Sequence, residues 1–236
     1  MADKTNPPEN EFAFTVRRPS PEQNPTYNEK EQCLLEKLSK GGDKATALWD
    51  LAKFYSGAGI ITKALEYIRQ ASNQAADPES MAYCYLGIGI AHEKLDDYES
   101  ARKVYMQAYA IEPVDPAVWY FINNNMGYCL NRLGKHEEAE RLCRTAIKTD
   151  PARHNAHKNL GISCAGKGDY AEAAKCFITA TRLEASDGRA LKHLEKLIEQ
   201  HGELTTQMPN LLSDLQACRR AVELANITRN SMNSKN

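Results

Sequence analysis

The sequence predicts an all-α protein built from stacked helical hairpins, and three observations predict it. Four times along the chain, a small residue is followed twelve positions later by alanine: Ala52/Ala64, Gly89/Ala101, Gly127/Ala139 and Gly161/Ala173. Each of these alanines is followed by a larger residue four positions on and by another alanine seven positions on. The 236 residues are 42% hydrophobic and 26% charged, as in ordinary folded chains, and no run approaches the eighteen or so apolar residues that span a bilayer.

Close packing of two helices explains the repeated pattern. Small residues let the helices of one hairpin approach, and the larger residues fill the space around the crossing: Ile68, Tyr105, Cys143 and Phe177. A turn residue separates the two helices of each hairpin: Gly59, Asp96, Gly134 and Gly168. Pro113 and Pro151 end second helices because proline cannot continue the hydrogen-bond ladder. One hairpin cannot bury its apolar face alone, so neighbouring hairpins must stack.

This pattern resembles the tetratricopeptide repeat, a 34-residue helix-turn-helix unit, over about residues 45–200. The resemblance implies a right-handed solenoid within an array at 41–200. Its four repeats and a degenerate fifth first helix are expected at 45–78, 82–115, 120–153, 154–187 and 188–200. Two insertions, at 74–80 and 112–118, lie between repeats, where longer surface turns are tolerated. An ordinary helical bundle is the alternative, which twelve small-residue positions in register disfavour.

Both ends of the array are expected to carry caps. Residues 1–25 contain five prolines and are predicted to be an extended or disordered tail. Residues 26–40 begin with a Ser/Thr-x-x-Glu sequence and are predicted to form a capping helix, and 201–236 a C-terminal covering helix and tail. In the fifth helix Glu195 replaces the small residue, so a normal partner helix should not pack there. Residues 11–16 alternate apolar side chains, which suits self-association or groove binding, although a plain tail is the alternative.

The resemblance also implies a binding surface, because family members contact ligands through positions 2, 5, 9, 12 and 13 of each first helix. The candidate peptide-binding residues chosen from these positions are Trp49, Lys53, Tyr83, Leu86, Ile90, Lys94, Phe121, Asn124, Tyr128, Asn131, Arg132, Asn155, Lys158, Ile162, Arg189, Lys192 and Lys196. Over all these positions, Lys and Arg occupy seven and Glu two. We therefore expect a groove with an apolar entrance and a cationic end, suited to an acidic segment or a C-terminal carboxylate. A solvated surface with incidental aromatics is the alternative.

Some family members clamp the terminal carboxylate of heat-shock chaperones with Lys, Asn and Arg at fixed repeat positions. Here only Asn159 and the cationic positions Arg189 and His193 fit that arrangement. Asn at the position of Asn159 is also common in the family generally, so the sequence does not favour this clamp.

Other functional classes are disfavoured. The chain contains no phosphate-binding loop, no dinucleotide-binding glycine motif after a strand, no hydrolase elbow and no zincin motif. Thirty basic against 31 acidic residues give a net charge of -1, so nucleic acid is not an expected partner. His154 and His157 are too few for zinc, so neither metal nor cofactor is expected. Seven cysteines without a CxxC pair, and an N-terminus without an apolar signal core, predict reduced thiols, a cytoplasmic location and no membrane association.

The predicted function is therefore non-catalytic: an adaptor, scaffold or assembly chaperone (co-chaperone) that holds a partner peptide in the concave groove. Two alternatives belong to other classes. A secretion-type chaperone would hold partly unfolded clients, and a regulatory subunit would change the rate of an enzyme complex. Fold resemblance alone does not choose among these roles.

Overall fold

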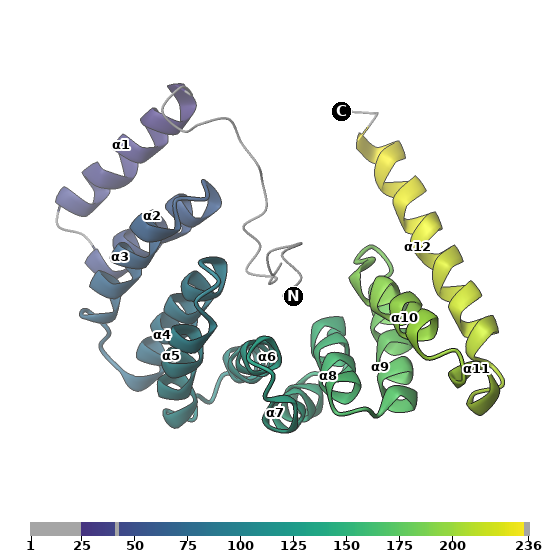
Figure 1. Cartoon of the computed structure of the whole chain (residues 1–236). Coiled ribbons are helices and arrows are strands. Elements are labelled where there is room, and N and C mark those ends of the chain that lie inside the picture. Colours follow the sequence, from purple (N-terminus) through teal and green to yellow (C-terminus); the bar gives the residue numbers. More distant parts are fainter. Residues whose placement is uncertain (1–24, 41–42, 234–236) are drawn as a thin grey trace. The chain divides into compact units, whose positions relative to one another are not determined.

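The computed structural model describes residues 25–40 and 43–233, and every regular element in these two ranges is a helix (Figure 1). The chain divides into two compact units, unit 1 up to Val118 and unit 2 from Trp119 onwards. Of the tail predicted at 1–25, residues 1–24, including the apolar segment 11–16, lie outside the described residues, and Pro25 is the first residue of a helix. In the described part, no helix combines the length and apolarity that crossing a bilayer requires.

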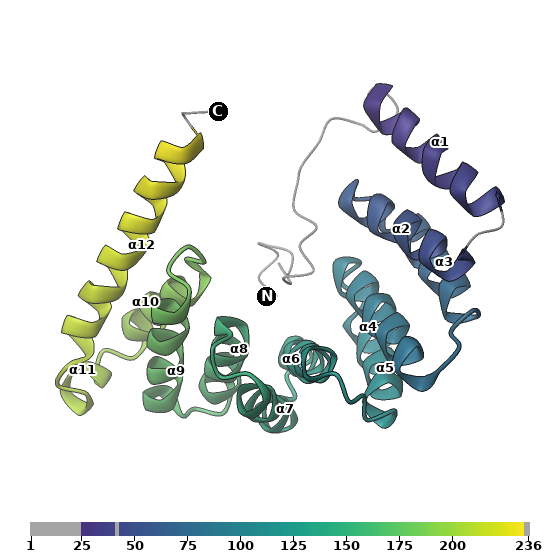
Figure 2. The same cartoon turned by 180° about the vertical axis from the view of Figure 1, so that it is seen from behind.

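Unit 1 contains a leading helix and two hairpins. The leading helix is α1 (Pro25–Ser39), and the hairpins are α2 (Lys44–Gly57) with α3 (Ile61–Ser72) and α4 (Pro78–Lys94) with α5 (Tyr98–Ala110). Figure 2 shows the two hairpins side by side. Asp43, Asp77 and Asp97 begin α2, α4 and α5 by accepting a hydrogen bond from the backbone N–H three residues on.

Helix α1 is held on the first hairpin by apolar packing and a partly buried hydrogen bond. Leu34 is buried in a cluster with Leu51, Tyr55 and Ala64. The Tyr55 hydroxyl donates to Glu31 Oε1 at 2.5 Å. The leading helix thus covers the outer end of the first hairpin, as a cap does.

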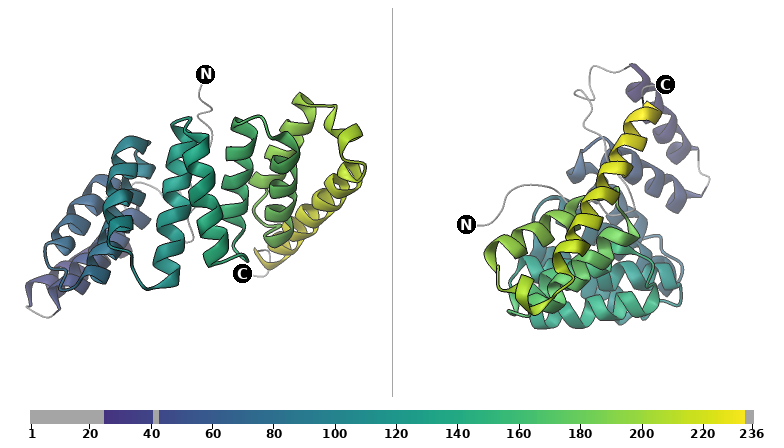
Figure 3. Two further views of the ribbon diagram at one scale, coloured as in Figure 1. Left: turned by 90° about the horizontal axis from the view of Figure 1, so that it is seen from below. Right: turned by 90° about the vertical axis from the view of Figure 1, so that its right-hand side faces the viewer.

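Unit 2 continues the hairpins and ends in a long helix. Helix α6 (Pro116–Arg132) begins at the end of unit 1 and lies mainly in unit 2, followed by α7 (His136–Thr149), α8 (His154–Gly166) and α9 (Tyr170–Leu183). Then come α10 (Arg189–Gln200), the short α11 (Leu204–Gln207) and α12 (Leu211–Asn233). Figure 3 shows α12 lying against α9 and α10. Glu195 of α10 accepts a hydrogen bond from Arg219 Nε of α12 at 2.7 Å, so the residue predicted to end the array faces the covering helix.

The predicted crossings are confirmed, because glycine sits where the second helix of the hairpin comes closest. A Cβ atom added at Gly161 would lie 2.5 Å from the Phe177 ring, and one at Gly127 would lie 2.8 Å from Cys143 Sγ. Gly89 is closed off in the same way by the ring of Tyr105. Two helices of one hairpin can approach this closely only because no side chain stands between them.

The predicted turn residues are also confirmed. Gly59, Gly134 and Gly168 follow the first helices of three hairpins with φ of 79°, 74° and 85°, and Asp96 takes the same place in the hairpin of α4 and α5 with φ of 57°. Left-handed backbone of this kind favours glycine, with aspartate among the tolerated alternatives. Each turn reverses the chain so that the second helix packs back on the first.

Candidate functional site

In unit 1, α2 and α4 lie side by side and run in the same direction. Near their N-terminal ends the rings of Trp49 and Tyr83 contact each other, with centroids 4.9 Å apart. Near their C-terminal ends Lys94 Nζ donates to Ser56 Oγ at 3.4 Å. The first helices of the two hairpins therefore form one continuous face.

That face contains a small apolar cavity of about 40 Å³, which we call the aromatic pocket. Its lining residues come from α2, α3 and α4: Trp49, Ala52, Lys53, Ser56, Ile68, Tyr83, Leu86, Gly87, Ile90 and Ala91. Five of the predicted binding residues meet here, and Lys94 contacts the rim through Ser56. Of the predicted unit 1 residues, Leu86 and Ile90 are buried while Lys53 is exposed.

Gly87 gives the aromatic pocket its shape. A Cβ atom at this position would lie 2.7 Å from Trp49 Cη2, so the indole ring rests against bare backbone. The two lysines near the pocket differ in environment. Lys53 lies 3.2 Å from Asp50, whereas burial lowers the pKa of Lys94, with the charge of Glu93 opposing that change.

A second, larger cavity of about 520 Å³ lies on the other side of the same aromatic pair. It shares Trp49 and Tyr83 with the aromatic pocket, but the charged residues in its lining are acidic: Asp43, Glu79 and Asp115. Burial, followed by the charge of Asp115, raises the pKa of Tyr83. Glu79 accepts the backbone N–H groups of Val114 and Asp115 at 3.0 and 3.1 Å, which fixes the loop after α5. The shared face of α2 and α4 is thus acidic at one end and basic at the other.

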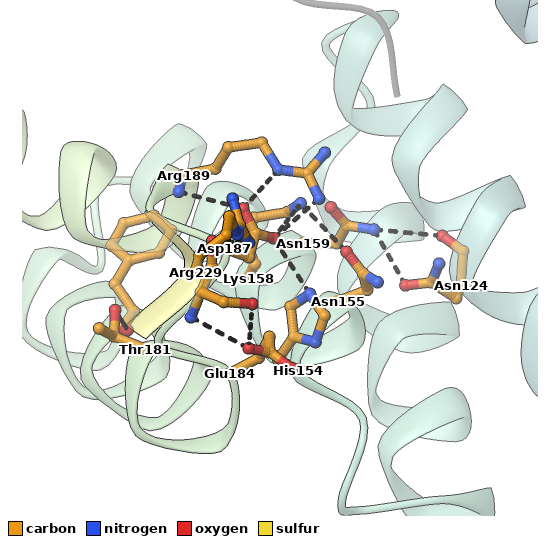
Figure 4. A network of polar contacts seen from close by, with 12 residues as sticks. Asn124, His154, Asn155, Lys158, Asn159, Thr181, Glu184, Asp187, Arg189 and Arg229 are labelled. Atoms are coloured by element: carbon orange, nitrogen blue, oxygen red, sulfur yellow. Dashed lines mark hydrogen bonds and ion pairs between the residues drawn. The ribbon is translucent and has the colours of Figure 1, made fainter. Parts of the chain in front are cut away.

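Unit 2 places asparagines, rather than aromatics, between its first helices. Asn159 of α8 donates through Nδ2 to Asn124 Oδ1 of α6 at 3.0 Å (Figure 4). Asn131 of α6 donates to the backbone oxygen of Asn159 at 2.9 Å and accepts from Ser163 Oγ at 3.0 Å. Lys158 Nζ donates to Asn155 Oδ1 at 3.1 Å. We call Asn124, Asn131, Asn155 and Asn159 the asparagine network; all four are buried.

One acceptor atom of the asparagine network, Asn159 Oδ1, has no hydrogen-bond donor among the described residues. This oxygen is buried. A buried polar atom without a partner costs about 1–3 kcal/mol. The unpaired oxygen of Asn159 therefore lowers the stability of the contact between α6 and α8. Residues at functional positions often carry such a penalty.

Asp187 joins the asparagine network to a cluster of charges before α10. Arg189 donates to both of its oxygens at 2.7 Å, His154 Nε2 lies 3.0 Å from Oδ2, and Lys158 Nζ lies 3.8 Å away (Figure 4). Burial raises the pKa of Asp187, but the hydrogen bonds from His154 and Arg189 and the charges of Lys158 and Arg189 outweigh it. The pKa therefore lies well below its ordinary value. Two of the predicted cationic positions are thus paired within the protein.

The other predicted residues of unit 2 have separate contacts and different degrees of burial. Phe121 is buried, with the Arg153 guanidinium 4.9 Å above its ring. Tyr128 is half-buried and its hydroxyl accepts from Arg132 Nη1 at 3.0 Å. The remaining positions are the partly buried Ile162 and the exposed Arg132, Lys192 and Lys196. Lys192 and Lys196 are exposed and take part in no ion pair within 25–40 and 43–233, so among the predicted cations of this unit they are the ones most open to a partner.

Sequence reasoning missed two residues that shape these sites. Gly87 occupies the repeat position that Asn159 occupies in the fourth repeat. A glycine at this position, with Trp49 in the preceding repeat, is the sequence signal that could have indicated the pocket. Asp187 lies in a turn outside the ligand-facing positions, and nothing in its local sequence reveals its three partners. The candidate clamp residues are also occupied, since Asn159 contacts Asn124 and Arg189 contacts Asp187.

Neither histidine considered for zinc faces a metal-like set of ligands. His154 contacts Asp187, and His157 Nε2 lies 2.9 Å from the Pro151 backbone oxygen. The described residues contain no group of three or more His, Cys, Asp or Glu side chains arranged to hold a metal ion.

Comparison with known sequences identifies the repeats. A family model described as Tetratricopeptide repeat matches residues 124–182, and a second model with the same description matches 82–115. Human Tetratricopeptide repeat protein 7B is 28% identical over 57% of this chain and 15% of its own length. The Peroxisomal targeting signal receptor of Eremothecium gossypii is 30% identical over 53% of this chain and 21% of its own length. The chain thus spans about a fifth or less of the curated relatives it matches.

Solved structures show the same fold at low sequence identity. The structure of MamA from residue 41 to its end, from Desulfovibrio magneticus RS-1, has a TM-score of 0.60 at 20% identity and covers 76% of this chain and 97% of that one. YrrB, described as a TPR protein with an unusual peptide-binding site, has a TM-score of 0.58 at 16% identity and covers 85% of this chain and 99% of its own. These likenesses show an all-α tetratricopeptide-repeat solenoid fold.

Proposed function

The chain is a tetratricopeptide-repeat protein, and we propose that it is a non-catalytic interaction module that binds a segment of a partner protein along its first helices. The observation that carries this proposal is the aromatic pocket. Two half-buried aromatic rings, an apolar floor and a lysine rim lie together on the face shared by α2 and α4. Such rings provide contact area at low entropic cost.

Unit 2 supports the same function through different chemistry. The amides of the asparagine network are buried, so the groups of unit 2 that a partner segment can reach lie on α10. Lys192 and Lys196 project from α10 on the exposed surface. These groups favour an acidic segment or a C-terminal carboxylate. Roles as adaptor, scaffold or assembly chaperone all use the binding of a partner segment. The name of the relative Peroxisomal targeting signal receptor, and the description of the structurally similar YrrB as a TPR protein with an unusual peptide-binding site, support this activity.

Selection of random peptides displayed on phage against the full chain tests the proposal. Each selected peptide should lose affinity for at least one of two variants of the chain: Trp49→Ala, or the double variant Lys192→Glu/Lys196→Glu. The peptides should keep binding to Lys103→Glu and Lys175→Glu, which alter exposed residues of the second helices α5 and α9. Failure to select any peptide, or equal losses for both groups of variants, would contradict the proposal.

The acidic preference is tested separately by salt. Fluorescence anisotropy of a labelled selected peptide should show affinity falling as sodium chloride rises from about 0.05 to 0.5 M, because screening weakens exposed charge pairs. Affinity that does not change with salt would remove the charge preference and leave the binding function standing.

A further inference from the structure

We propose that the aromatic pocket accepts one aliphatic side chain of the partner segment, and that a neighbouring acidic side chain of the segment pairs with Lys53 and Lys94. The inference rests on the proposed function and names the partner's chemistry at one place. Neither the resemblance to the repeat family nor the relatives assign this pocket a ligand.

The lining of the pocket selects an aliphatic group. Apart from Lys53 and Ser56, the side chains around the cavity are apolar, including Ile68, Leu86 and Ile90. The volume of about 40 Å³ is several times the 10–15 Å³ that holds one water molecule, yet the walls offer water few hydrogen bonds. A branched aliphatic side chain fills such a space favourably, whereas a charged one would lose its hydration.

Gly87 sets the position of the Trp49 ring beside the aromatic pocket. With no side chain at this position, the Trp49 ring lies against the helix backbone. Adding a methyl group would push the indole ring, at its far end, out of its present place. The shape of the pocket therefore depends on a residue that would contact the ligand only through its backbone.

Charge sets the polarity of the bound segment. Because α2 and α4 run in parallel, Asp43 and Glu79 mark one end of their shared face, and Lys53 and Lys94 lie toward the other. A carboxylate beside the aliphatic side chain is attracted at the lysine end and repelled at the end that carries Asp43, Glu79 and Asp115. The acidic residue of the segment therefore points toward the C-terminal ends of α2 and α4.

The test is a heptapeptide display selection on the full chain, followed by affinity measurement of the enriched peptides. Enriched sequences should combine Leu, Ile, Val or Met with Asp or Glu no more than two residues away. Replacing the aliphatic residue by Asp, or the chain's Gly87→Ala substitution, should weaken binding about tenfold or more. Lys53→Glu/Lys94→Glu should weaken it about tenfold by reversing the charge at the rim.

Two matched controls keep the test specific. Gly202→Ala adds a methyl group where nothing lies within 4 Å, and Lys103→Glu reverses an exposed charge on the second helix α5 of the same unit. Both should change affinity by less than about twofold. Circular dichroism checks that each variant is folded.

The outcomes separate the two proposals. No enriched peptide would contradict both the proposed function and this inference. Enriched peptides that lack the aliphatic–acidic pair, or that bind Gly87→Ala and Lys53→Glu/Lys94→Glu as well as the unaltered chain, would overturn the pocket assignment alone. Peptides that meet the composition and lose affinity with both variants would establish it.

Discussion

The two units use one repeat pattern to build two different faces. In unit 1 the fifth position of the first repeat is Trp49 and the sixth position of the next is Gly87, so a ring lies on bare backbone beside a cavity. In unit 2 the corresponding residues are Asn124 and Asn159, which hydrogen-bond to each other at 3.0 Å. The comparison shows that the pair of residues meeting across neighbouring repeats, rather than either residue alone, decides whether the face is apolar or polar.

The same contrast applies to charge. In unit 1 the acidic residues Asp43 and Glu79 lie at the N-terminal ends of α2 and α4, and the exposed Lys53 is paired with Asp50. In unit 2 Asp187 holds Arg189, His154 and Lys158 in one cluster, and its side chain is only 11% exposed. Unit 2 should therefore depend on its polar contacts for stability more than unit 1 does.

The largest expected effect is the loss of the Asp187 charge. Asp187→Asn leaves Arg189 and Lys158 without their common counter-charge and should lower the free energy of unfolding by about 3 kcal/mol. Urea unfolding followed by circular dichroism measures it. The control Asp214→Asn, which disrupts an ion pair with the exposed Arg182, should cost less than about 1 kcal/mol. Equal effects of the two substitutions would contradict the special role of Asp187.

Lowering the pH should remove the stabilising contribution of Asp187 without any substitution. The pKa of Asp187 is lowered in the folded chain from 3.8, so its stabilising contribution is present above about pH 3.8 and is lost progressively as the pH falls below that value. Native-state hydrogen exchange at α8 and α10 should therefore accelerate in this range for the unaltered chain. Asp187→Asn should remove most of that acceleration; an unchanged pH dependence in the variant would assign it to other carboxylates.

A smaller loss is expected from filling a helix crossing. Gly161→Ala places a methyl group against the buried Phe177 ring and should destabilise the fold by about 2 kcal/mol, because the ring has little room to move. Thermal unfolding measures the change. Gly202→Ala has open space around it and serves as the control. If the Gly161→Ala chain were as stable as the control, the helices at this crossing would have more room than the 2.5 Å separation indicates.

The asparagine network should contribute less than the crossing. Asn159→Ala removes the donor to Asn124 and should cost about 1 kcal/mol, since it also removes the unpaired Oδ1. Asn226→Ala, on the exposed surface of α12, is the matched control for urea unfolding. A stability gain in Asn159→Ala would mean that the unpaired oxygen outweighs the hydrogen bond.

The thiols should distinguish the exposed surface of α1 from the buried core without a stability change. Burial raises the pKa of Cys143 and Cys176 to about 12 and that of Cys164 to about 11, whereas Cys33 of unit 1 is exposed. A short iodoacetamide pulse at pH 8, read by mass spectrometry, should label Cys33 and leave these three unmodified until the chain unfolds. Fast labelling of any of the three would show that the core of unit 2 opens readily.

The sequence predicted the elements set by contacts within one hairpin. Gly161 facing Phe177, and Gly134 and Asp96 in left-handed turns, follow from local spacing and from the few residues that such backbone accepts. It was less informative about contacts between hairpins. Asn131 and Lys158 occupy ligand-facing positions in the repeat, yet both are buried because the neighbouring first helix and Asp187 lie against them. Those neighbours are 28 and 29 residues away, and only the packed structure shows which side chains they bring.

Hydrogen–deuterium exchange of the full chain, with and without a selected peptide, tests the central claim most directly. We expect slower exchange in the first helices, either α2 and α4 in unit 1 or α8 and α10 in unit 2, while α3, α5 and α9 keep their rates. Protection confined to those second helices would contradict it.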